Sequence, residues 1–246
     1  MDYMDLLARL GISSAHPGGF RATRKLLEKG RLAAGLHILE VGCGTGKTAC
    51  YLARQGCQVT ALDQHPLMLE KARKRAEQEG AKGIRFVEGS VLALPFEDAS
   101  FDMVFAESVT IFADLSMALR EYHRVLKPEG RLLDRELVLD QPMPEEIGRE
   151  IKSFFRLQKI YTVDEWLKEL YRAGFECERP DPEAFGSIEP DLPEESGMRE
   201  LDLTALFDPE IGSSLLKYSD LMVKQQTYFK ACDFVAVKTP VHVPPA

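Results

Sequence analysis

The fold is decided by the stretch His37-Ile-Leu-Glu-Val-Gly-Cys-Gly-Thr-Gly46. Its apolar residues on either side of Glu40 predict a buried strand, and the turn that follows contains three alternating glycines: Gly42, Gly44 and Gly46. Missing side chains let the backbone of such a turn approach a ligand closely. A second apolar run ends in another acidic residue, Asp63, seventeen residues after the last glycine. The sequence therefore predicts a ligand site formed by a strand, a glycine turn and a helix.

The spacing of the glycines argues against two ligand classes that use a similar turn. A phosphate-binding P-loop needs a glycine five residues before Gly46, where this chain has Val41, and Glu40 would repel a polyphosphate. A dinucleotide fingerprint needs its third glycine three residues after the second, whereas Gly46 follows Gly44 by two. A nucleoside-triphosphate or nicotinamide enzyme is therefore retained only as a weaker alternative.

Four further segments follow the glycine turn in a fixed order. They are Ala61-Leu-Asp-Gln-His-Pro-Leu-Met-Leu-Glu-Lys-Ala72, Phe86-Val-Glu-Gly-Ser-Val-Leu-Ala-Leu-Pro-Phe96, Ser100-Phe-Asp-Met-Val-Phe-Ala-Glu107 and Arg124-Val-Leu-Lys-Pro-Glu-Gly-Arg131. With the turn, they resemble the motifs of the class I S-adenosylmethionine-dependent methyltransferases over roughly residues 36 to 140, and a weaker likeness continues from Thr162 to Phe175. The resemblance implies S-adenosylmethionine as cofactor and S-adenosylhomocysteine as product.

Apolar runs alternate with helical periods from residue 36 onward. The expected strands are Leu36–Val41, Gln58–Leu62, Ile84–Val87, Phe101–Ala106 and Arg131–Leu139, and the expected helices are Lys47–Gln55, Pro66–Glu79 and Ser116–Leu126. This alternation predicts right-handed crossovers and a parallel sheet covered on both faces. The resemblance extends it to a Rossmann-like, doubly wound α/β fold with a seven-stranded, mostly parallel sheet whose last strand is antiparallel.

Three regions are expected: an N-terminal helical cap over 1–35, a cofactor-binding α/β core over 36–140, and a region over 141–246 that completes the sheet. The last region opens with a polar, proline-containing connection from Asp140. It should contain a helix over Thr162–Arg172 and short strands over Phe175–Glu178 and Phe234–Lys238. An insertion at about 179–230, with helices near Met198–Leu206 and Ile211–Lys230, is either a lid over the acceptor or peripheral packing.

The N-terminal cap has its own candidate contact with a ligand. Helices are expected over Tyr3–Leu10 and Arg21–Gly30, joined through His16-Pro-Gly-Gly-Phe20. Two adjacent glycines permit either a plain connecting turn or a close approach of the backbone to the cofactor, and related methyltransferases often place such a segment over the cofactor.

The candidate cofactor residues follow strand ends, where open sheets of this kind bind ligands. The ammonium of S-adenosylmethionine would face Glu40, and the ribose hydroxyls would bind Asp63, unless Asp63 instead caps the helix from Pro66. Met68 would face the adenine, bordered by Ser90, where the family usually has Asp. The full predicted set is Glu40, Gly42, Cys43, Gly44, Gly46, Asp63, Gln64, Met68, Ser90, Val91 and Glu107.

The implied reaction is direct displacement at the sulfonium methyl by a small-molecule acceptor. A phenol or thiol acceptor would need a base, and the candidates are Glu107, then His16 and Glu136; the alternative for each is a surface or supporting role. No metal is expected, because the five cysteines form no C-x-x-C pair. The alternative functions are a non-catalytic S-adenosylmethionine-binding module and methylation of a protein side chain.

Composition limits the partners. The chain has 246 residues and a net charge of −8, and residues 141–246 hold 20 acidic and 12 basic residues while the first 140 hold 19 of each. Such an acidic part would repel a phosphate backbone, so nucleic acid is not the expected partner, although it can also be a plain solvated face. No signal peptide or membrane span is indicated, which predicts a cytoplasmic enzyme without a membrane partner. The acceptor is expected to be neutral or cationic.

Overall fold

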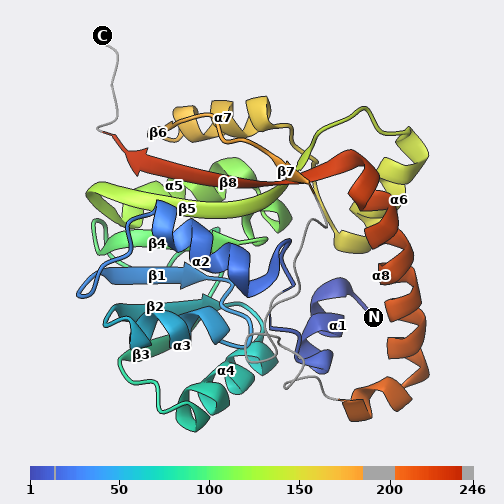
Figure 1. The fold of residues 1–246 in the computed structure, drawn as a ribbon, viewed down its shortest axis with the longest axis horizontal. Helices are drawn as coiled ribbons and strands as arrows, with labels where there is room; N and C mark the ends of the chain where they lie inside the picture. The colour runs from blue at the N-terminus through green and yellow to red at the C-terminus, as the bar shows by residue number, and fades with distance from the viewer. Residues whose placement is uncertain (14, 185–202, 240–246) are drawn as a thin grey trace.

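A mixed β-sheet forms the centre of the molecule (Figure 1). The structure is a computed structural model and describes residues 1–13, 15–184 and 203–239. Its strands are β1 His37–Val41, β2 Gln58–Asp63, β3 Ile84–Glu88, β4 Phe101–Glu107, β5 Leu126–Leu139, β6 Phe175–Cys177, β7 Glu183–Ala184 and β8 Phe229–Lys238. The order across the sheet is β3-β2-β1-β4-β5-β8-β6, and β7 pairs with β8 beside this path.

The strand directions confirm the predicted Rossmann-like fold. Strands β1 to β5 pair in parallel, whereas β8 is antiparallel to both of its neighbours, β5 and β6. The last strand is longer than the sequence suggested, since β8 begins at Phe229 and not at Phe234. Nearly all of its first six residues are buried. A continuous buried run lacks the alternation that marks a strand, so the preceding helix was expected to extend too far.

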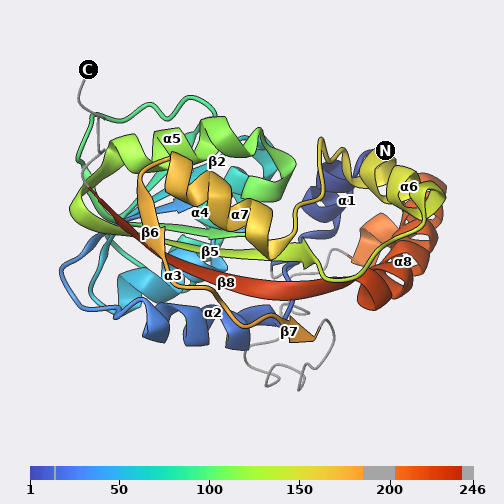
Figure 2. The same cartoon turned by 90° about the horizontal axis from the view of Figure 1, so that it is seen from above.

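Helices cover both faces of the sheet (Figure 2). Their bounds are α1 Tyr3–Leu10, α2 Gly19–Lys29, α3 Lys47–Arg54, α4 Pro66–Gln78, α5 Leu115–Val125, α6 Glu145–Phe155, α7 Val163–Arg172 and α8 Pro209–Tyr228, with short 3₁₀ turns η1 Thr110–Phe112 and η3 Leu203–Phe207. Leu26 of α2, Leu52 of α3 and Leu69 of α4 pack on one face. Leu119 of α5 and Trp166 of α7 pack on the other. Both faces are therefore apolar and buried, as a parallel sheet requires.

Three helices, α1, α6 and α8, lie beyond the carboxyl ends of the parallel strands and are called the cap helices (Figures 1 and 2). Their side chains share one apolar cluster, in which Tyr3 of α1, Phe155 of α6 and Leu221 of α8 are buried. Arg9 of α1 also forms an ion pair with Asp208, the residue that caps α8, at 3.3 Å. The cap helices therefore pack as one layer over the edge of the sheet at which ligands bind in such folds.

One expectation for the C-terminal region needs correction. The polar connection after Asp140 ends at Pro144, and α6 follows it, although no helix was expected there. The signal was present: Glu145 and Glu146 suit a helix N-terminus, and apolar residues recur at helical spacing after them. Helix α8 begins at Pro209 and matches the helix expected from Ile211, whereas most of the helix expected near Met198 lies outside the described residues.

Within the described ranges, no helix combines the length and the apolar character needed to cross a bilayer.

Candidate active site

The glycine turn after β1 leaves room for a ligand at one position. Gly42, Gly44 and Gly46 all have positive φ, at 62°, 52° and 77°. A Cβ on Gly42 would lie 2.3 Å from a methyl group of Val109, and one on Gly46 would lie 2.8 Å from the Cβ of Ala72, so both positions pack tightly against protein. A Cβ on Gly44 would meet no atom within 4 Å. Of these three glycines, only Gly44 therefore has open space where a side chain would lie.

A cavity of about 520 Å³ lies at the carboxyl ends of β1, β2 and β4, beside Gly44. It brings together all but one of the residues predicted to bind the cofactor, together with His16. Those that line it are Glu40, Gly42, Cys43, Gly44, Asp63, Gln64, Met68, Ser90, Val91 and Glu107. Gly46 is not part of this wall, because its missing side chain faces α4. Its observed role is packing between two helices.

Asp63 holds the turn and the start of α4 through backbone N–H groups. The N–H of Gly44 donates to its Oδ2 and the N–H of His65 to its Oδ1, both at 2.8 Å. His65, not Asp63, occupies the N-cap position of α4. Burial raises the pKa of the Asp63 carboxyl, and these N–H groups partly offset the rise. Each carboxylate oxygen keeps a further lone pair, so Asp63 can still accept from two adjacent hydroxyls.

Glu40 supplies a second acidic group to the cavity and is 5% exposed at the end of β1. Among the residues that the structure describes, its Oε2 atom has no hydrogen-bond partner. Burial raises the pKa of the Glu40 carboxyl well above its ordinary value, and the charges of Glu107 and Asp63 raise it further. A buried polar atom without a partner in the protein indicates a group that a ligand satisfies.

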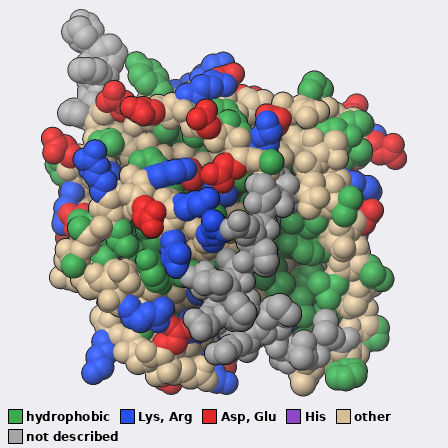
Figure 3. All heavy atoms as spheres, in the orientation of Figure 1, with side chains coloured by type: hydrophobic (Ala, Val, Ile, Leu, Met, Phe, Trp, Pro, Cys, Tyr) green, Lys and Arg blue, Asp and Glu red, His purple; other side chains and the backbone are tan. Residues whose placement is uncertain are grey.

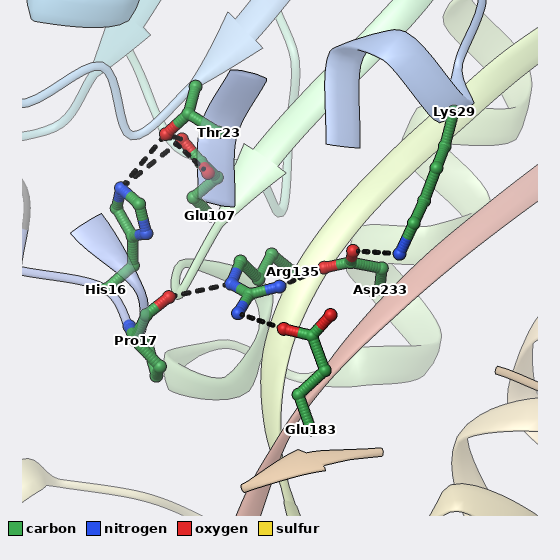
Figure 4. A network of polar contacts seen from close by, with 8 residues as sticks. All are labelled: His16, Pro17, Thr23, Lys29, Glu107, Arg135, Glu183 and Asp233. Atoms are coloured by element: carbon green, nitrogen blue, oxygen red, sulfur yellow. Dashed lines mark hydrogen bonds and ion pairs between the residues drawn. The ribbon is translucent and has the colours of Figure 1, made fainter. Parts of the chain in front are cut away.

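Glu107 and His16 form a buried pair in the wall of this cavity (Figure 4). Oε2 of Glu107 lies 3.6 Å from Nε2 of His16, and both side chains are 8% exposed. The hydroxyl of Thr23 in α2 donates to the carboxylate at 2.9 and 3.1 Å and lies 3.3 Å from Nε2 of His16. Burial raises the pKa of the Glu107 carboxyl to about 8.

Arg135 holds the segment that carries His16 against the sheet. Its Nε donates to the carbonyl oxygen of Pro17 at 2.7 Å, and its guanidinium also pairs with Asp233 and Glu183 (Figure 4). Lys29 contacts the other oxygen of Asp233 at 2.6 Å. Arg135 is 3% exposed, so its charge is buried and compensated by two carboxylates. Sequence reasoning missed both Arg135 and Thr23, because neither stands in a motif.

A second cavity of about 250 Å³ adjoins the first and is bounded by the cap helices. Seven of the described residues line both cavities: Tyr3, Ile12, Ala15, His16, Ser108, Phe112 and Phe155. Hydrophobic side chains gather in the recess beside α8 in Figure 3, and Tyr218 and Met222 of that helix line the second cavity. The sequence indicated a cap there but not which of its side chains reach the site.

Glu136 lines the second cavity and supports its wall. Its Oε1 accepts from the backbone N–H groups of Val109, Thr110 and Ile111 at 3.0, 2.8 and 3.2 Å. Burial raises the pKa of the Glu136 carboxyl well above its ordinary value, and the nearby Asp134 raises it further. One oxygen of this candidate base is thus used to hold η1, whose Phe112 belongs to both cavities.

Comparisons with known proteins agree with this arrangement. A family described as "Methyltransferase domain" matches residues 39–133. The chain is 36% identical to the uncharacterized methyltransferase YodH of Bacillus subtilis over 96% of this chain and 99% of that protein. It is also 36% identical to the O-methyltransferase resE of Aspergillus sclerotiorum, over 63% of this chain and 60% of that protein.

A solved structure has a similar fold. Haemonchus contortus phosphoethanolamine N-methyltransferase 2, in complex with S-adenosyl-L-methionine, is similar with a TM-score of 0.76 and 24% identity, over 96% of this chain and 57% of that one. The near full-length match to YodH, together with the motifs and the sheet order, shows the family. The chain belongs to the class I S-adenosylmethionine-dependent methyltransferases.

Proposed function

We propose that this enzyme transfers the methyl group of S-adenosylmethionine directly to a small molecule held in the second cavity. The observation that carries the proposal is the wall shared by the two cavities, since a donor in the first and an acceptor in the second would meet there. S-adenosylmethionine supplies a sulfonium methyl group whose departing thioether is neutral. Much of the rate acceleration can therefore come from holding the two reactants in line.

The first cavity fits this cofactor by the chemistry of its donors. The orphaned Oε2 of Glu40 can accept from the ammonium of the methionine part, and the open side of Gly44 admits that part close to the backbone. Asp63 can accept from both ribose hydroxyls. Met68, which is 7% exposed, offers an apolar face to the adenine. Ser90 accepts from the N–H of Leu92 at 3.2 Å and retains its hydroxyl proton for donation.

The second cavity favours a small molecule over a nucleic acid or a protein side chain. No Lys or Arg occurs among the described residues of its wall, so the wall offers nothing to pair with a phosphate. Its volume of about 250 Å³ suits a compact acceptor. The cap helices α1, α6 and α8 all contribute to it, which supports the interpretation of the C-terminal helical region as a cover for the acceptor.

Calorimetric titration tests the cofactor part of the proposal. The protein is titrated with S-adenosylmethionine, S-adenosylhomocysteine, ATP and NAD, and only the first two are expected to bind. Asp63→Ala should weaken this binding by about 2 kcal/mol, roughly thirtyfold in Kd, because two charge-assisted hydrogen bonds to the ribose are lost. Asp102→Ala is the matched control, since Asp102 is bonded to Lys127 and to the N–H of His37 and lines neither cavity. Binding of ATP or NAD alone would refute the proposal.

Release of S-adenosylhomocysteine across a panel of small acceptors tests the catalytic part. Tight cofactor binding without turnover on any acceptor would favour the non-catalytic binding module.

A further inference from the structure

We propose, building on the methyl transfer set out above, that the acceptor is a neutral, largely apolar molecule methylated on a weakly acidic hydroxyl, a phenol or an enol, and that His16, supported by Glu107, removes the hydroxyl proton.

His16 occupies the place where such a base is needed. Of the described residues that line both cavities, His16 is the only one whose side chain ordinarily changes its charge near neutral pH. A donor methyl group and an acceptor oxygen that meet at this wall therefore meet beside the imidazole. Its segment is fixed, because Arg135 bonds the carbonyl of the next residue, Pro17, at 2.7 Å.

Glu107 gives the imidazole the partner that a general base requires. Its carboxyl group lies 3.6 Å from Nε2 of His16, close enough to stabilise, once ionised, the imidazolium that forms when the ring takes a proton. The Thr23 hydroxyl donates to the same carboxyl group and also lies 3.3 Å from Nε2 of His16. The remaining charged groups that act on Glu107 are Glu40 of β1, Asp134 and Arg135 of β5 and Asp233 of β8.

The wall of the second cavity selects against charged acceptors. Aromatic rings from the cap helices and η1 surround the cavity. The centroid of the Tyr3 ring lies 4.8 Å from that of Phe155 and 5.6 Å from that of Tyr218. The described part of the wall holds no cation for a carboxylate or a phosphate. Oε1 of Glu136, the acidic group of this wall, is already engaged by three backbone N–H groups. A neutral apolar ring with one polar group is the complementary ligand.

Polar side chains in the wall can orient such a ring. Ser108 belongs to both cavities, and Gln225 of α8, which is 3% exposed, belongs to the second. An amide can both donate and accept, so Gln225 can bond a carbonyl or a second hydroxyl on the acceptor. Bonds of this kind would fix which hydroxyl faces His16.

The acceptor O–H bond breaks and its proton passes to the imidazole of His16. The oxygen lone pair forms the new bond to the methyl carbon. The sulfur–methyl bond breaks, and its electron pair stays on sulfur, which becomes a neutral thioether. The resulting imidazolium lies 3.6 Å from the Glu107 carboxyl group and later returns its proton to solvent.

A matched set of acceptors tests the class of substrate. The protein with S-adenosylmethionine is incubated with 1-naphthol, 1-naphthylamine and 1-naphthoate, and with sets of smaller phenols, amines and carboxylates, and products are identified by mass spectrometry. We expect O-methylated phenols and no product from the amines or carboxylates. N-methylation or ester formation would overturn the inference while leaving methyl transfer intact. Failure to bind S-adenosylmethionine would instead overturn the proposed function, and cofactor binding without any product would overturn both the inference and the catalytic part.

Substitution of the base tests the role of His16. His16→Gln should lower kcat by about a hundredfold or more, abolish the acid limb of the pH–rate profile, and leave KM and the Kd of S-adenosylhomocysteine within about twofold. Added imidazole should restore part of the rate. A calorimetric titration of 1-naphthol into the protein with S-adenosylhomocysteine should give nearly the same Kd for both forms, which separates loss of the base from loss of the cavity. His123→Gln is the control, because His123 contacts Thr239 and lines neither cavity. An unchanged pH profile in His16→Gln would refute the assignment.

Discussion

The guanidinium of Arg135 and the carbonyl oxygen of Pro17 are joined by a 2.7 Å hydrogen bond between residues 118 positions apart. Through it, strand β5 fixes the segment that precedes α2 and carries His16. Gly18, the residue after Pro17, also packs closely against Arg135. A Cβ at Gly18 would lie 3.0 Å from Nη2 of Arg135 and 2.6 Å from the Cβ of Ala22. Arg135 is thus a positioning residue for the proposed base, although it lines neither cavity.

Arg135→Lys should therefore reduce turnover more than cofactor binding. A lysine keeps the charge between Asp233 and Glu183 but lacks the planar fork that also reaches Pro17. We expect kcat to fall about tenfold and the free energy of unfolding to fall by about 1–2 kcal/mol, with the Kd of S-adenosylmethionine unchanged. Steady-state kinetics and urea unfolding measure both effects. Arg131→Lys is the control on the same strand, because it loses a comparable bond to the carbonyl of Gly30, remote from His16. Equal losses of turnover in the two variants would contradict a positioning role.

Gly44→Ala should impair the cofactor site by steric obstruction. Its φ of 52° makes any side chain strained by about 1 kcal/mol, but the added methyl group meets no protein atom and would occupy the ligand side of the turn. We expect a loss of affinity for S-adenosylmethionine of tenfold or more, measured by calorimetry. Gly80→Ala is a matched control: its φ is 61°, its Cβ would also be free, and it lies outside both cavities. Gly80→Ala should have the same backbone strain but bind S-adenosylmethionine with normal affinity. If Gly44→Ala and Gly80→Ala bound S-adenosylmethionine equally well, the proposal that the cofactor approaches the backbone at Gly44 would be wrong.

Glu107→Gln should change how stability depends on pH. The carboxyl has an ordinary pKa near 4.5, and burial raises it to about 8 in the folded protein. The folded state therefore holds this proton more tightly than the unfolded state, so its stabilising effect is present below about pH 4.5 and is lost as pH rises through about 8. The wild-type melting temperature should fall from pH 5.5 to 8.5 in the absence of ligand, and the variant should show a smaller fall by scanning calorimetry. A variant with an equal or steeper fall would show that Glu107 is not the responsible group.

Met222→Trp should block the acceptor without affecting the cofactor. Met222 lines only the second cavity, and an indole there would fill part of its roughly 250 Å³. We expect the KM for a phenol to rise by tenfold or more while the Kd of S-adenosylmethionine changes by less than about twofold. The neighbouring Val223 is 64% exposed, so Val223→Trp adds the same side chain to the same helix and should leave both constants unchanged. Loss of cofactor binding in Met222→Trp would place the two ligands in one undivided cavity.

The sequence was most informative where local chemistry is strict. Gly44, Asp63 and Glu40 could be assigned to one site because parallel strands end at the same edge of a sheet, so residues that close separate strands meet there. Gly46 shows the limit of this reasoning. A side chain at this position would collide with Ala72 of α4. The spacing of the glycines within the turn does not reveal this contact with a neighbouring helix.

Residues whose role depends on tertiary packing were out of reach. Arg135 stands in β5 outside any motif, and its partners lie 98 and 48 residues away in the chain. The acceptor wall is equally non-local, because Tyr3, Phe155 and Tyr218 come from three cap helices. For α6, apolar residues did recur at helical spacing, but the prolines that precede them favoured a loop. Its Phe155 can be recognised as a site residue only once the packing is known.

The position of β8 has a consequence for assembly. This strand is made after every other described element, yet it lies between β5 and β6 and carries Asp233 to Arg135. Until residues 229–238 leave the ribosome, one edge of β5 is unpaired and the guanidinium of Arg135 lacks the carboxylate of Asp233. A nascent chain that already contains the whole glycine turn therefore still cannot close the sheet. Maturation of the acceptor pocket must wait for synthesis of the last strand.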